Sequence, residues 1–376
     1  MQCFRAETVP FRTDMVRIRT ETVQKRTEKV RKHLHAADMK EVGVDIVGFG
    51  NVGRALGRLL YTRREQLPFK VVSLVSARHG WSTDPNRIDL RGALEGGDLP
   101  PKGPPPKIAD LPGDVLVELT TLDPRTGQPA TDHVREALRA GKHVVTANKG
   151  PIAHHYAELR DLARSVDRRL LFEATLSDCL PVFNLMRHSL PLARIRRIRG
   201  IVSSTTNHIL SAAARGVPFA EALADAQRLG IAEADPANDL EGWDAAAKAT
   251  ILANVLMEAS VAVADVRRSP IDDTVAKEAA RVAASGGRLR PLIEIAGGAA
   301  TFAPRRLEPL DPLYAVDGLS MALELETDLA GRVVVQLHDP HVEQVAYAVL
   351  TDLLDIAGWT APVSPSSAQG AGSAGD

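Results

Sequence analysis

A short acidic segment with one lysine contains the residue types that could carry out proton chemistry. Asp244 and Lys248 stand four residues apart, so they share one face of a predicted helix. The rest of that helix is small and apolar, which suits burial. A lysine buried beside a carboxylate can act as a proton donor with an adjusted pKa, whereas the simpler alternative is an ordinary helical salt bridge. The carboxylates of the segment are Glu233, Asp235, Asp239, Glu241 and Asp244.

A glycine motif near the start of the chain indicates nucleotide binding. Gly48-Phe-Gly-Asn-Val-Gly53 follows a short apolar run and precedes a helical stretch, which is the context of the dinucleotide fingerprint. Gly48 permits the tight turn, Gly50 lets the backbone approach a pyrophosphate, and Gly53 allows close strand–helix packing. The phosphates then lie at the helix N-terminus, beside Asn51 and Val52.

The end of the next strand bears on the choice between NAD and NADP. It reads Leu74-Val-Ser-Ala-Arg-His79 and has no carboxylate for a ribose hydroxyl. Ser76 and Arg78 could instead contact a 2′-phosphate, which favours NADP over NAD. The alternative is that Arg78 is a solvated loop residue.

A second lysine follows the fourth predicted strand, in Thr146-Ala-Asn-Lys-Gly150. Ligands of open α/β sheets bind at the carboxyl ends of the strands. Lys149 could therefore meet a substrate carboxylate or polarise a carbonyl, and a surface lysine is the equally simple alternative.

Strands that alternate with helices predict a Rossmann-type doubly wound parallel sheet, followed by a second, mixed α/β domain. We expect residues 40–176 to form the NAD(P)-binding domain and residues 177–335 a substrate and dimerisation domain, with a last helix at 342–355 packing back on the first. Residues 80–107 read as a polar loop region. We expect 1–39 to be a disordered or non-native extension and 361–376 a disordered tail. The strand-like runs are 42–48, 69–76, 114–120, 143–146, 169–173, 195–202, 323–325 and 332–337, and the helical ones are 54–64, 132–140, 152–165, 220–229, 243–258 and 342–354.

Composition narrows the class of protein. The chain has 376 residues, a net charge of −1 and two cysteines. The charge gives no reason to expect a nucleic acid or an anionic membrane as partner, and no apolar run approaches the ~18 residues of a spanning helix. Few cysteines and no Sec-type signal favour a reducing, cytoplasmic location.

Taken together, these motifs resemble the homoserine dehydrogenase family. The matching pieces are residues 48–56, 141–153, 172–175 and 200–207 and the acidic segment 233–248, in the same order along the chain. The resemblance implies a homodimeric enzyme that uses NADP or NAD and interconverts L-homoserine and L-aspartate 4-semialdehyde. That reaction belongs to threonine and methionine biosynthesis and has a small amino-acid substrate.

The resemblance also implies roles for single residues. Lys248 corresponds to the proton donor or acceptor, and Lys149 to a second lysine that faces substrate and nicotinamide. The expected substrate-binding residues are Glu233, Asp239, Asp244 and Thr205, with Glu233 and Asp244 holding the amino group. Thr120 and Thr121 correspond to cofactor-proximal residues, and Glu173 precedes the loop of a monovalent cation site.

Four segments depart from the family pattern. Glycine-rich turns of the family are replaced by Leu176-Ser-Asp-Cys-Leu-Pro181, by Ser203-Ser204 and by residues 337–342, and Ile231 replaces a usual aromatic residue. Side chains at positions that approach a ligand should reshape the pocket. One alternative is therefore a relative that acts on another small amino- or hydroxy-acid. Another is a catalytically inactive nucleotide-binding regulatory protein, against which the retained lysines and carboxylates argue.

Overall fold

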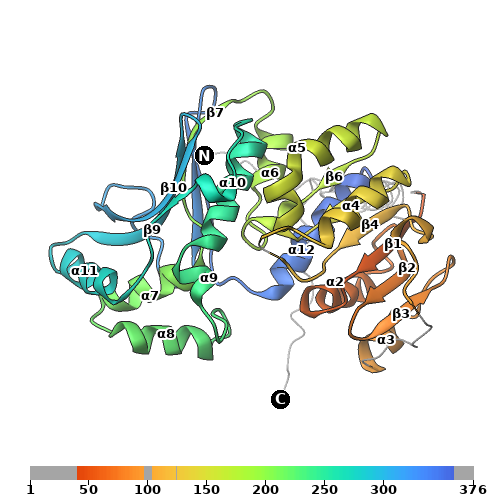
Figure 1. Ribbon diagram of the computed structural model, residues 1–376, viewed down its shortest axis with the longest axis horizontal. Coiled ribbons are helices and arrows are strands. Elements are labelled where there is room, and N and C mark those ends of the chain that lie inside the picture. The colour runs from red at the N-terminus through yellow and green to blue at the C-terminus, as the bar shows by residue number, and fades with distance from the viewer. Residues whose placement is uncertain (1–39, 97–103, 124, 360–376) are drawn as a thin grey trace, which may run out of the picture.

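Two six-stranded sheets build two lobes of the molecule. The computed structural model describes residues 40–96, 104–123 and 125–359. Figure 1 shows the lobes side by side, with the first half of the chain in one lobe and most of the second half in the other. The chain then returns, because α12 (Val342–Ile356) packs into the core of the first lobe. The predicted extension at 1–39 and the tail at 361–376 lie outside the described residues.

The first sheet has the strand order β3-β2-β1-β4-β5-β6. All neighbouring pairs run parallel except β2 and β3, which are antiparallel. The strands β1, β2, β4 and β5 form because their apolar runs are buried on both faces, as expected for a parallel sheet. The predicted doubly wound sheet is confirmed. Its strands are β1 (Val42–Val47), β2 (Phe69–Ser76), β3 (Gly80–Thr83), β4 (Val115–Glu118), β5 (His143–Thr146) and β6 (Leu170–Leu171).

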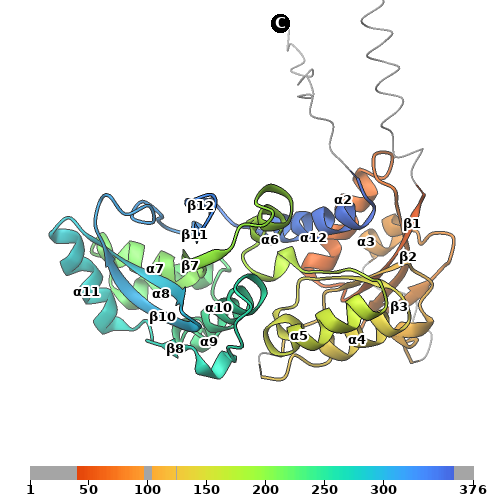
Figure 2. The same cartoon turned by 90° about the horizontal axis from the view of Figure 1, so that it is seen from above.

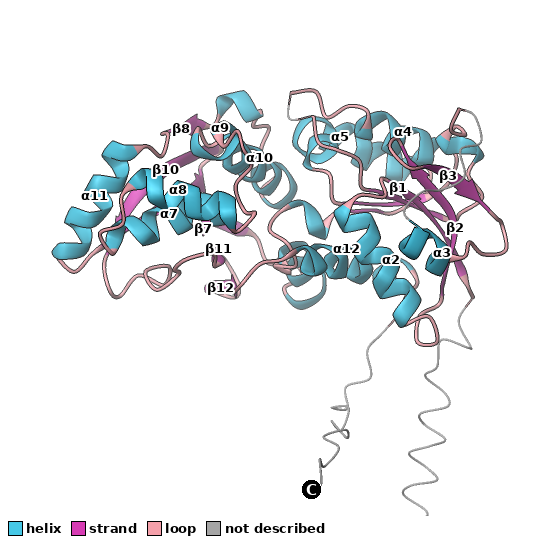
Figure 3. Ribbon diagram, turned by 90° about the horizontal axis from the view of Figure 1, so that it is seen from below, coloured by secondary structure: helices cyan, strands magenta, loops and turns pink. Residues whose placement is uncertain are grey.

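Helices cover both faces of this sheet, and Figure 3 shows the strands between them. On one face, α4 (Ala130–Arg139) and α5 (Lys149–Ser165) pack on one apolar cluster. On the other face, α2 (Asn51–Thr62), α3 (Leu90–Gly96) and α12 share a second cluster. This layering leaves the carboxyl ends of the parallel strands free to face a ligand.

The second sheet is mostly antiparallel, with the order β12-β11-β7-β9-β10-β8. Gly297 and Gly298 join β9 to β10, and both have positive φ (55° and 77°), as the tight turn of a hairpin requires. The exception to the antiparallel pattern is β8, which runs parallel to β10. The strands are β7 (Ile195–Ile201), β8 (Arg267–Arg268), β9 (Arg288–Ala296), β10 (Ala299–Leu307), β11 (Met321–Thr327) and β12 (Arg332–Leu337).

One face of the second sheet carries the helices of its lobe. Ile198, Ile293 and Ile295 of the sheet are buried in one cluster with the apolar residues of α10. Figure 2 shows α9 and α10 on the side of this lobe that faces α5 of the first. The predicted mixed α/β second domain is confirmed. Its helices are α7 (Ser204–Ala214), α8 (Phe219–Arg228), α9 (Ala237–Leu240), α10 (Trp243–Leu256) and α11 (Asp273–Ala284).

Four local differences separate the structure from the prediction. The region 80–107, expected to be a polar loop, contains β3 and α3, and a short 3-10 helix follows it at Ile108–Asp110. The helix α5 begins at Lys149 rather than at 152, and α7 has no counterpart in the prediction. The strand expected at 169–173 is only Leu170–Leu171, and Glu173 starts a 3-10 turn instead. In the part of the chain that the structure describes, no helix is long and apolar enough to cross a membrane.

Candidate active site

The glycine turn between β1 and α2 has the shape that the fingerprint predicts. Gly48 has φ of +102°, and a Cβ added there would lie 2.3 Å from the backbone of Leu119. A Cβ at Gly53 would lie 2.3 Å from the carbonyl oxygen of Gly48. At Gly50, by contrast, an added Cβ would meet nothing within 4 Å. Two of the three glycines are therefore required by the protein's own packing, whereas Gly50 faces open space.

The N-terminus of α2 is ready to receive an anion. Gly50 is its N-cap, and no side chain caps the helix. The first two helical residues are Asn51 and Val52. No acidic residue stands in its first turn. Free backbone N–H groups and the positive end of the helix dipole favour a phosphate at this place. Together with the open space at Gly50, this geometry fits the pyrophosphate of a dinucleotide.

The end of β2 presents the residues considered for cofactor choice. Ser76 is half-buried, and its hydroxyl accepts the backbone N–H of His79 at 3.2 Å. Arg78 lies in the turn after the strand and is exposed. These positions leave Arg78 free to reach solvent or a ligand.

A buried glutamate at the end of β4 holds the loop that follows this strand. Glu118 accepts the backbone N–H of Thr120 at 3.1 Å and also accepts the Thr120 hydroxyl. Asn148 donates its side-chain amide to the Thr120 carbonyl at 3.1 Å. Thr120 is thereby held at the carboxyl edge of the first sheet, and the neighbouring Thr121 is exposed.

Lys149 is the first residue of α5. The Asn148 side chain caps this helix by accepting the Gly150 N–H at 3.0 Å. The Lys149 Nζ lies 3.3 Å from Oδ1 of Asp244, which belongs to the other lobe. That carboxylate is the main cause of the raised pKa of Lys149, which opposes the effect of burial. Lys149 is therefore held as an ammonium group.

Lys248 meets the other oxygen of the same aspartate. Its Nζ lies 2.9 Å from Oδ2 of Asp244 and donates to the Val202 carbonyl at 2.5 Å. The residue is only 8 % exposed. Burial alone would raise the pKa of the Asp244 carboxyl, but Lys149 and Lys248 together hold it well below its usual range. Asp244 is thus a shared counter-ion for two lysines.

The remaining predicted substrate residues divide into two groups. The Thr205 hydroxyl lies 2.9 Å from Oδ2 of Asp239 and 2.8 Å from the carbonyl of Ile231. Burial, and next the charge of Asp244, raise the pKa of Asp239. Glu233 is exposed, and among the described residues its contact is through its backbone carbonyl, which accepts a hydrogen bond from the Gln227 side chain at 3.2 Å. The structure brings Asp239, Thr205, Asp244 and both lysines together, but it does not bring the Glu233 side chain to them.

Two cavities meet at this cluster. A cavity of about 300 Å³ lies at the carboxyl edge of the first sheet and has Val52, Thr120, Lys149 and Lys248 in its wall. A larger one of about 600 Å³ has Lys149 and Asp244 in its wall, together with Trp243. Lys149 belongs to both walls, whereas Lys248 belongs to the wall of the smaller cavity alone, so ligands in the two cavities could both reach the Lys149 ammonium group.

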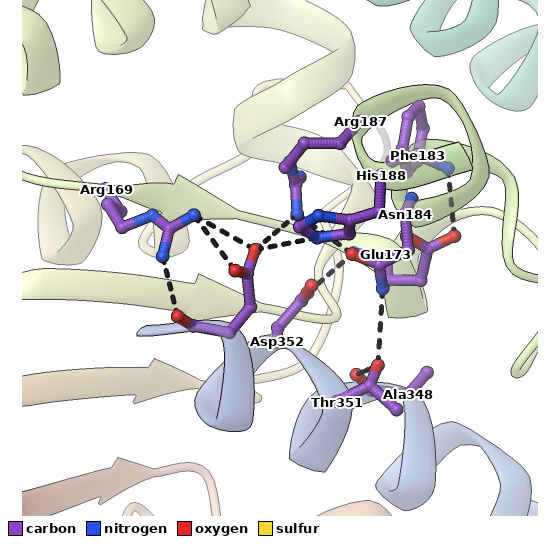
Figure 4. Close-up of polar contacts among 10 residues, drawn as sticks. Arg169, Glu173, Phe183, Asn184, Arg187, His188, Ala348, Thr351 and Asp352 are labelled. Atoms are coloured by element: carbon purple, nitrogen blue, oxygen red, sulfur yellow. Dashed lines mark hydrogen bonds and ion pairs between the residues drawn. The ribbon is translucent and has the colours of Figure 1, made fainter. Parts of the chain in front are cut away.

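Glu173, the residue considered for a monovalent cation, has a different task here (Figure 4). Its carboxylate accepts the backbone N–H groups of Phe183 at 3.0 Å and Asn184 at 2.6 Å, and so holds α6 (Val182–Asn184). The described residues contain no group of three or more His, Cys, Asp or Glu side chains suited to a metal ion. Cation binding by Glu173 stays a prediction, and these hydrogen bonds give it no support.

Sequence reasoning assigned no role to Ser177 or Asp178, two of the polar residues of the smaller cavity. Ser177 and Asp178 lie in its wall with Lys149 and Lys248. They belong to the segment 176–181, which the loss of glycines marks as unusual, so the place was signalled although the roles were not.

This arrangement defines an oxidoreductase that uses a nicotinamide dinucleotide. A model of the homoserine dehydrogenase NAD-binding domain matches residues 48–173, and a model of the homoserine dehydrogenase domain matches residues 181–354. The homoserine dehydrogenase of Methanocaldococcus jannaschii is 36 % identical over 329 residues, which cover 83 % of this chain and 97 % of that protein. The NAD(+)-dependent homoserine dehydrogenase of Pseudomonas canavaninivorans is 33 % identical, over 85 % of this chain and 97 % of that protein.

A solved structure agrees. The homoserine dehydrogenase of Thermoplasma acidophilum superposes with a TM-score of 0.74 at 27 % identity, over 85 % of this chain and all of that chain. The chain belongs to the homoserine dehydrogenase family and is an NAD(P)-dependent oxidoreductase.

Proposed function

We propose that this protein interconverts L-homoserine and L-aspartate 4-semialdehyde by hydride transfer. The observation that carries the proposal is the Lys149–Asp244–Lys248 cluster, which joins the two lobes at the carboxyl edge of the dinucleotide-binding sheet. An amino-acid substrate needs carboxylates for its ammonium group and ammonium groups for its carboxylate. Both kinds of charge are present around these cavities.

The first lobe would hold the cofactor. The turn at Gly48, Gly50 and Gly53 and the start of α2 would bind the pyrophosphate, and Thr120 and Thr121 would lie near the nicotinamide end. When bound, the dinucleotide supplies the acceptor or donor of the hydride. We further propose that Ser76 and Arg78 favour NADP. The end of β2 has no carboxylate, and a carboxylate there would repel a 2′-phosphate.

Lys248 would exchange the proton of the substrate hydroxyl. An alcohol that loses hydride from its carbon must also lose the proton of its oxygen, and the reverse reaction must regain it. Lys248 is buried, and its contacts with Asp244 and the Val202 carbonyl fix the direction of its amino group. Lys149, held as an ammonium group, would orient the substrate from the other lobe.

The other charged residues would set the position of the amino acid. Asp239, Asp244 and Thr205 lie where they could receive the ammonium group, and Glu233 would have to turn inward to join them. We also propose the division of the chain into a cofactor domain, 40–176 with α12, and a substrate and dimerisation domain, 177–335, and a homodimeric assembly.

The test is an absorbance assay of the purified full-length chain. L-Homoserine with NADP or NAD should give reduced nicotinamide at a rate that saturates with homoserine. A panel of small hydroxy- and amino-acids, measured in parallel, serves as the comparison. Turnover of another member of the panel in place of homoserine would overturn the proposed substrate, and absence of turnover with every member would overturn the proposed reaction.

A further inference from the structure

Asp178 occupies an unusual backbone position in the wall of the smaller cavity. It lies between the 3-10 turn Glu173–Thr175 and α6, and its φ is +48°, in the region that favours glycine. The residue is half-buried and shares the cavity wall with Lys149 and Lys248. In this left-handed conformation an aspartate has a higher conformational free energy than a glycine. We therefore expect the Asp178 side chain to have a role that offsets this cost.

The Asp178 carboxylate has no hydrogen bond or ion pair with any residue that the structure describes. The two other aspartates of the site differ, because both oxygens of Asp244 face lysines and Asp239 is engaged by Thr205. The adjacent Ser177 is 3 % exposed, and within the described chain its hydroxyl also lacks a partner. A buried hydroxyl group is normally paired, so Ser177, together with the unpaired Asp178 carboxylate, presents unused hydrogen-bonding capacity at this cavity.

The charges around Asp178 are not balanced. Burial raises its pKa, while Lys248, Lys149 and His341 lower it and Asp244 raises it again. Lys149 and Lys248 already share Asp244, so a negative charge at Asp178 or Asp239 remains without a counter-ion of its own. A ligand with a cationic group would complete this site, whereas a ligand with anionic groups alone would be disfavoured there.

We propose that Asp178 binds the ammonium group of the amino-acid substrate and so selects amino acids over hydroxy-acids that lack the amine. This inference rests on the proposed function, which it deepens by naming a specificity-determining residue. Ser177 would support it by hydrogen bonding to the same end of the substrate. Asp244 would then serve chiefly as the counter-ion of the two lysines.

The experiment measures binding as well as turnover. With the full-length chain saturated with NADPH, calorimetry gives Kd for L-homoserine and for 4-hydroxybutanoate, which is the same molecule without its amino group. The wild type should prefer homoserine. Asp178→Asn should weaken homoserine binding about 10- to 100-fold, the worth of a charged hydrogen bond, and leave Kd for 4-hydroxybutanoate and for NADPH nearly unchanged.

A second aspartate with a left-handed backbone serves as the control for effects of backbone strain. Asp167 is exposed, belongs to the wall of neither cavity and also has a left-handed φ, of +51°. Asp178→Gly removes the strain together with the carboxylate and should lose homoserine affinity as Asp178→Asn does. Asp167→Asn and Asp167→Gly should not.

Two results would overturn the inference: an unchanged homoserine Kd in both Asp178 variants, or a loss confined to NADPH affinity, which would place Asp178 at the nicotinamide. The proposed function fails separately. Wild-type protein that binds homoserine through Asp178 but never oxidises it would support the inference and refute the reaction.

Discussion

The Oδ2 atom of Asp244 lies 2.9 Å from the Nζ of Lys248, one turn later in the same helix. Lys248 is buried and Asp244 is half-buried, and the second oxygen of Asp244 reaches across to Lys149 of the other lobe. A surface pair of this spacing would contribute little. Here Asp244 connects Lys248 to Lys149 of the other lobe, and all three residues line the cavities of the site. We therefore expect substitutions in this cluster to alter catalysis more than stability.

Removing the Lys248 amino group should abolish most turnover. Lys248→Met keeps the length of the side chain but cannot carry a proton, so kcat should fall by about 10²- to 10⁴-fold, while Kd for NADP stays near the wild-type value. The control is Lys277→Met on the exposed face of α11. Lys277 also pairs with an aspartate four residues earlier, because its Nζ lies 2.6 Å from Oδ2 of Asp273. Steady-state kinetics and cofactor titration check both, and normal turnover by Lys248→Met would refute the role.

Asp244→Asn should change the pH profile. Asp244 is the main cause of the raised pKa of Lys149, so the pKa should fall when that charge is lost. Activity that needs the Lys149 ammonium group would then decline at a lower pH, so the alkaline limb of the kcat/KM profile should shift to lower pH. Asp273→Asn is the control. An unmoved alkaline limb in Asp244→Asn would show that Lys149 does not limit the reaction.

Much of the cofactor lobe could be predicted from the sequence because its strands are continuous apolar runs and its turn has fixed glycine spacing. The strand His143–Thr146 has the bounds expected. Residues 80–83 and 90–96 were not predicted as elements, because they are short and have few apolar residues, and their structure depends on pairing with β2 and packing on α2.

The site was predictable where its contacts are local. The spacing of Asp244 and Lys248 indicates their pairing, but no local pattern could bring Lys149 of α5 to Asp244. The orientation of Asp178 is likewise set by the tertiary structure around segment 176–181. The inward position expected for Glu233 has no local signal either, and its side chain is exposed.

Two glycines of the fingerprint should respond in opposite ways to alanine. At Gly50 a methyl group meets nothing within 4 Å, so Gly50→Ala should fold normally and lose affinity for NADP, because the methyl group occupies the space of the pyrophosphate. At Gly53 it meets the Gly48 carbonyl at 2.3 Å, so Gly53→Ala should lower Tm. Thermal unfolding and cofactor titration separate the effects, and equal Tm losses would contradict this reading of the turn.

Arg78→Asp should shift cofactor preference. Arg78 is exposed at the end of β2, and a carboxylate there would repel a 2′-phosphate and accept a ribose hydroxyl. The ratio of kcat/KM for NADP to that for NAD should fall by about tenfold or more. Arg139→Asp, an exposed charge reversal in α4, is the control. An unchanged ratio in Arg78→Asp would remove the basis for preferring NADP.

The buried Asp352 of α12 should make stability depend on pH. Its Oδ2 accepts the Glu173 N–H at 2.8 Å (Figure 4), and burial raises its pKa to about 8. The hydrogen bond from the Glu173 N–H and the charge of Arg187 work against this rise in the pKa, and the charges of Glu173 and Asp355 support it. The unfolded chain ionises the group near the usual value of about 3.9. Folding therefore takes up a proton between these two pH values.

Stability should accordingly fall as pH rises from about 4 to about 8, by up to about 1.4 kcal/mol for each pH unit, and level off above. Asp352→Asn retains a carbonyl acceptor for Glu173 but cannot ionise, so its stability relative to the wild type should grow over that range. Urea unfolding across a pH series checks this, with Asp161→Asn, an exposed partner of Arg160, as the control. A difference between Asp352→Asn and the wild type that stays constant with pH would show that Asp352 is already ionised in the folded protein.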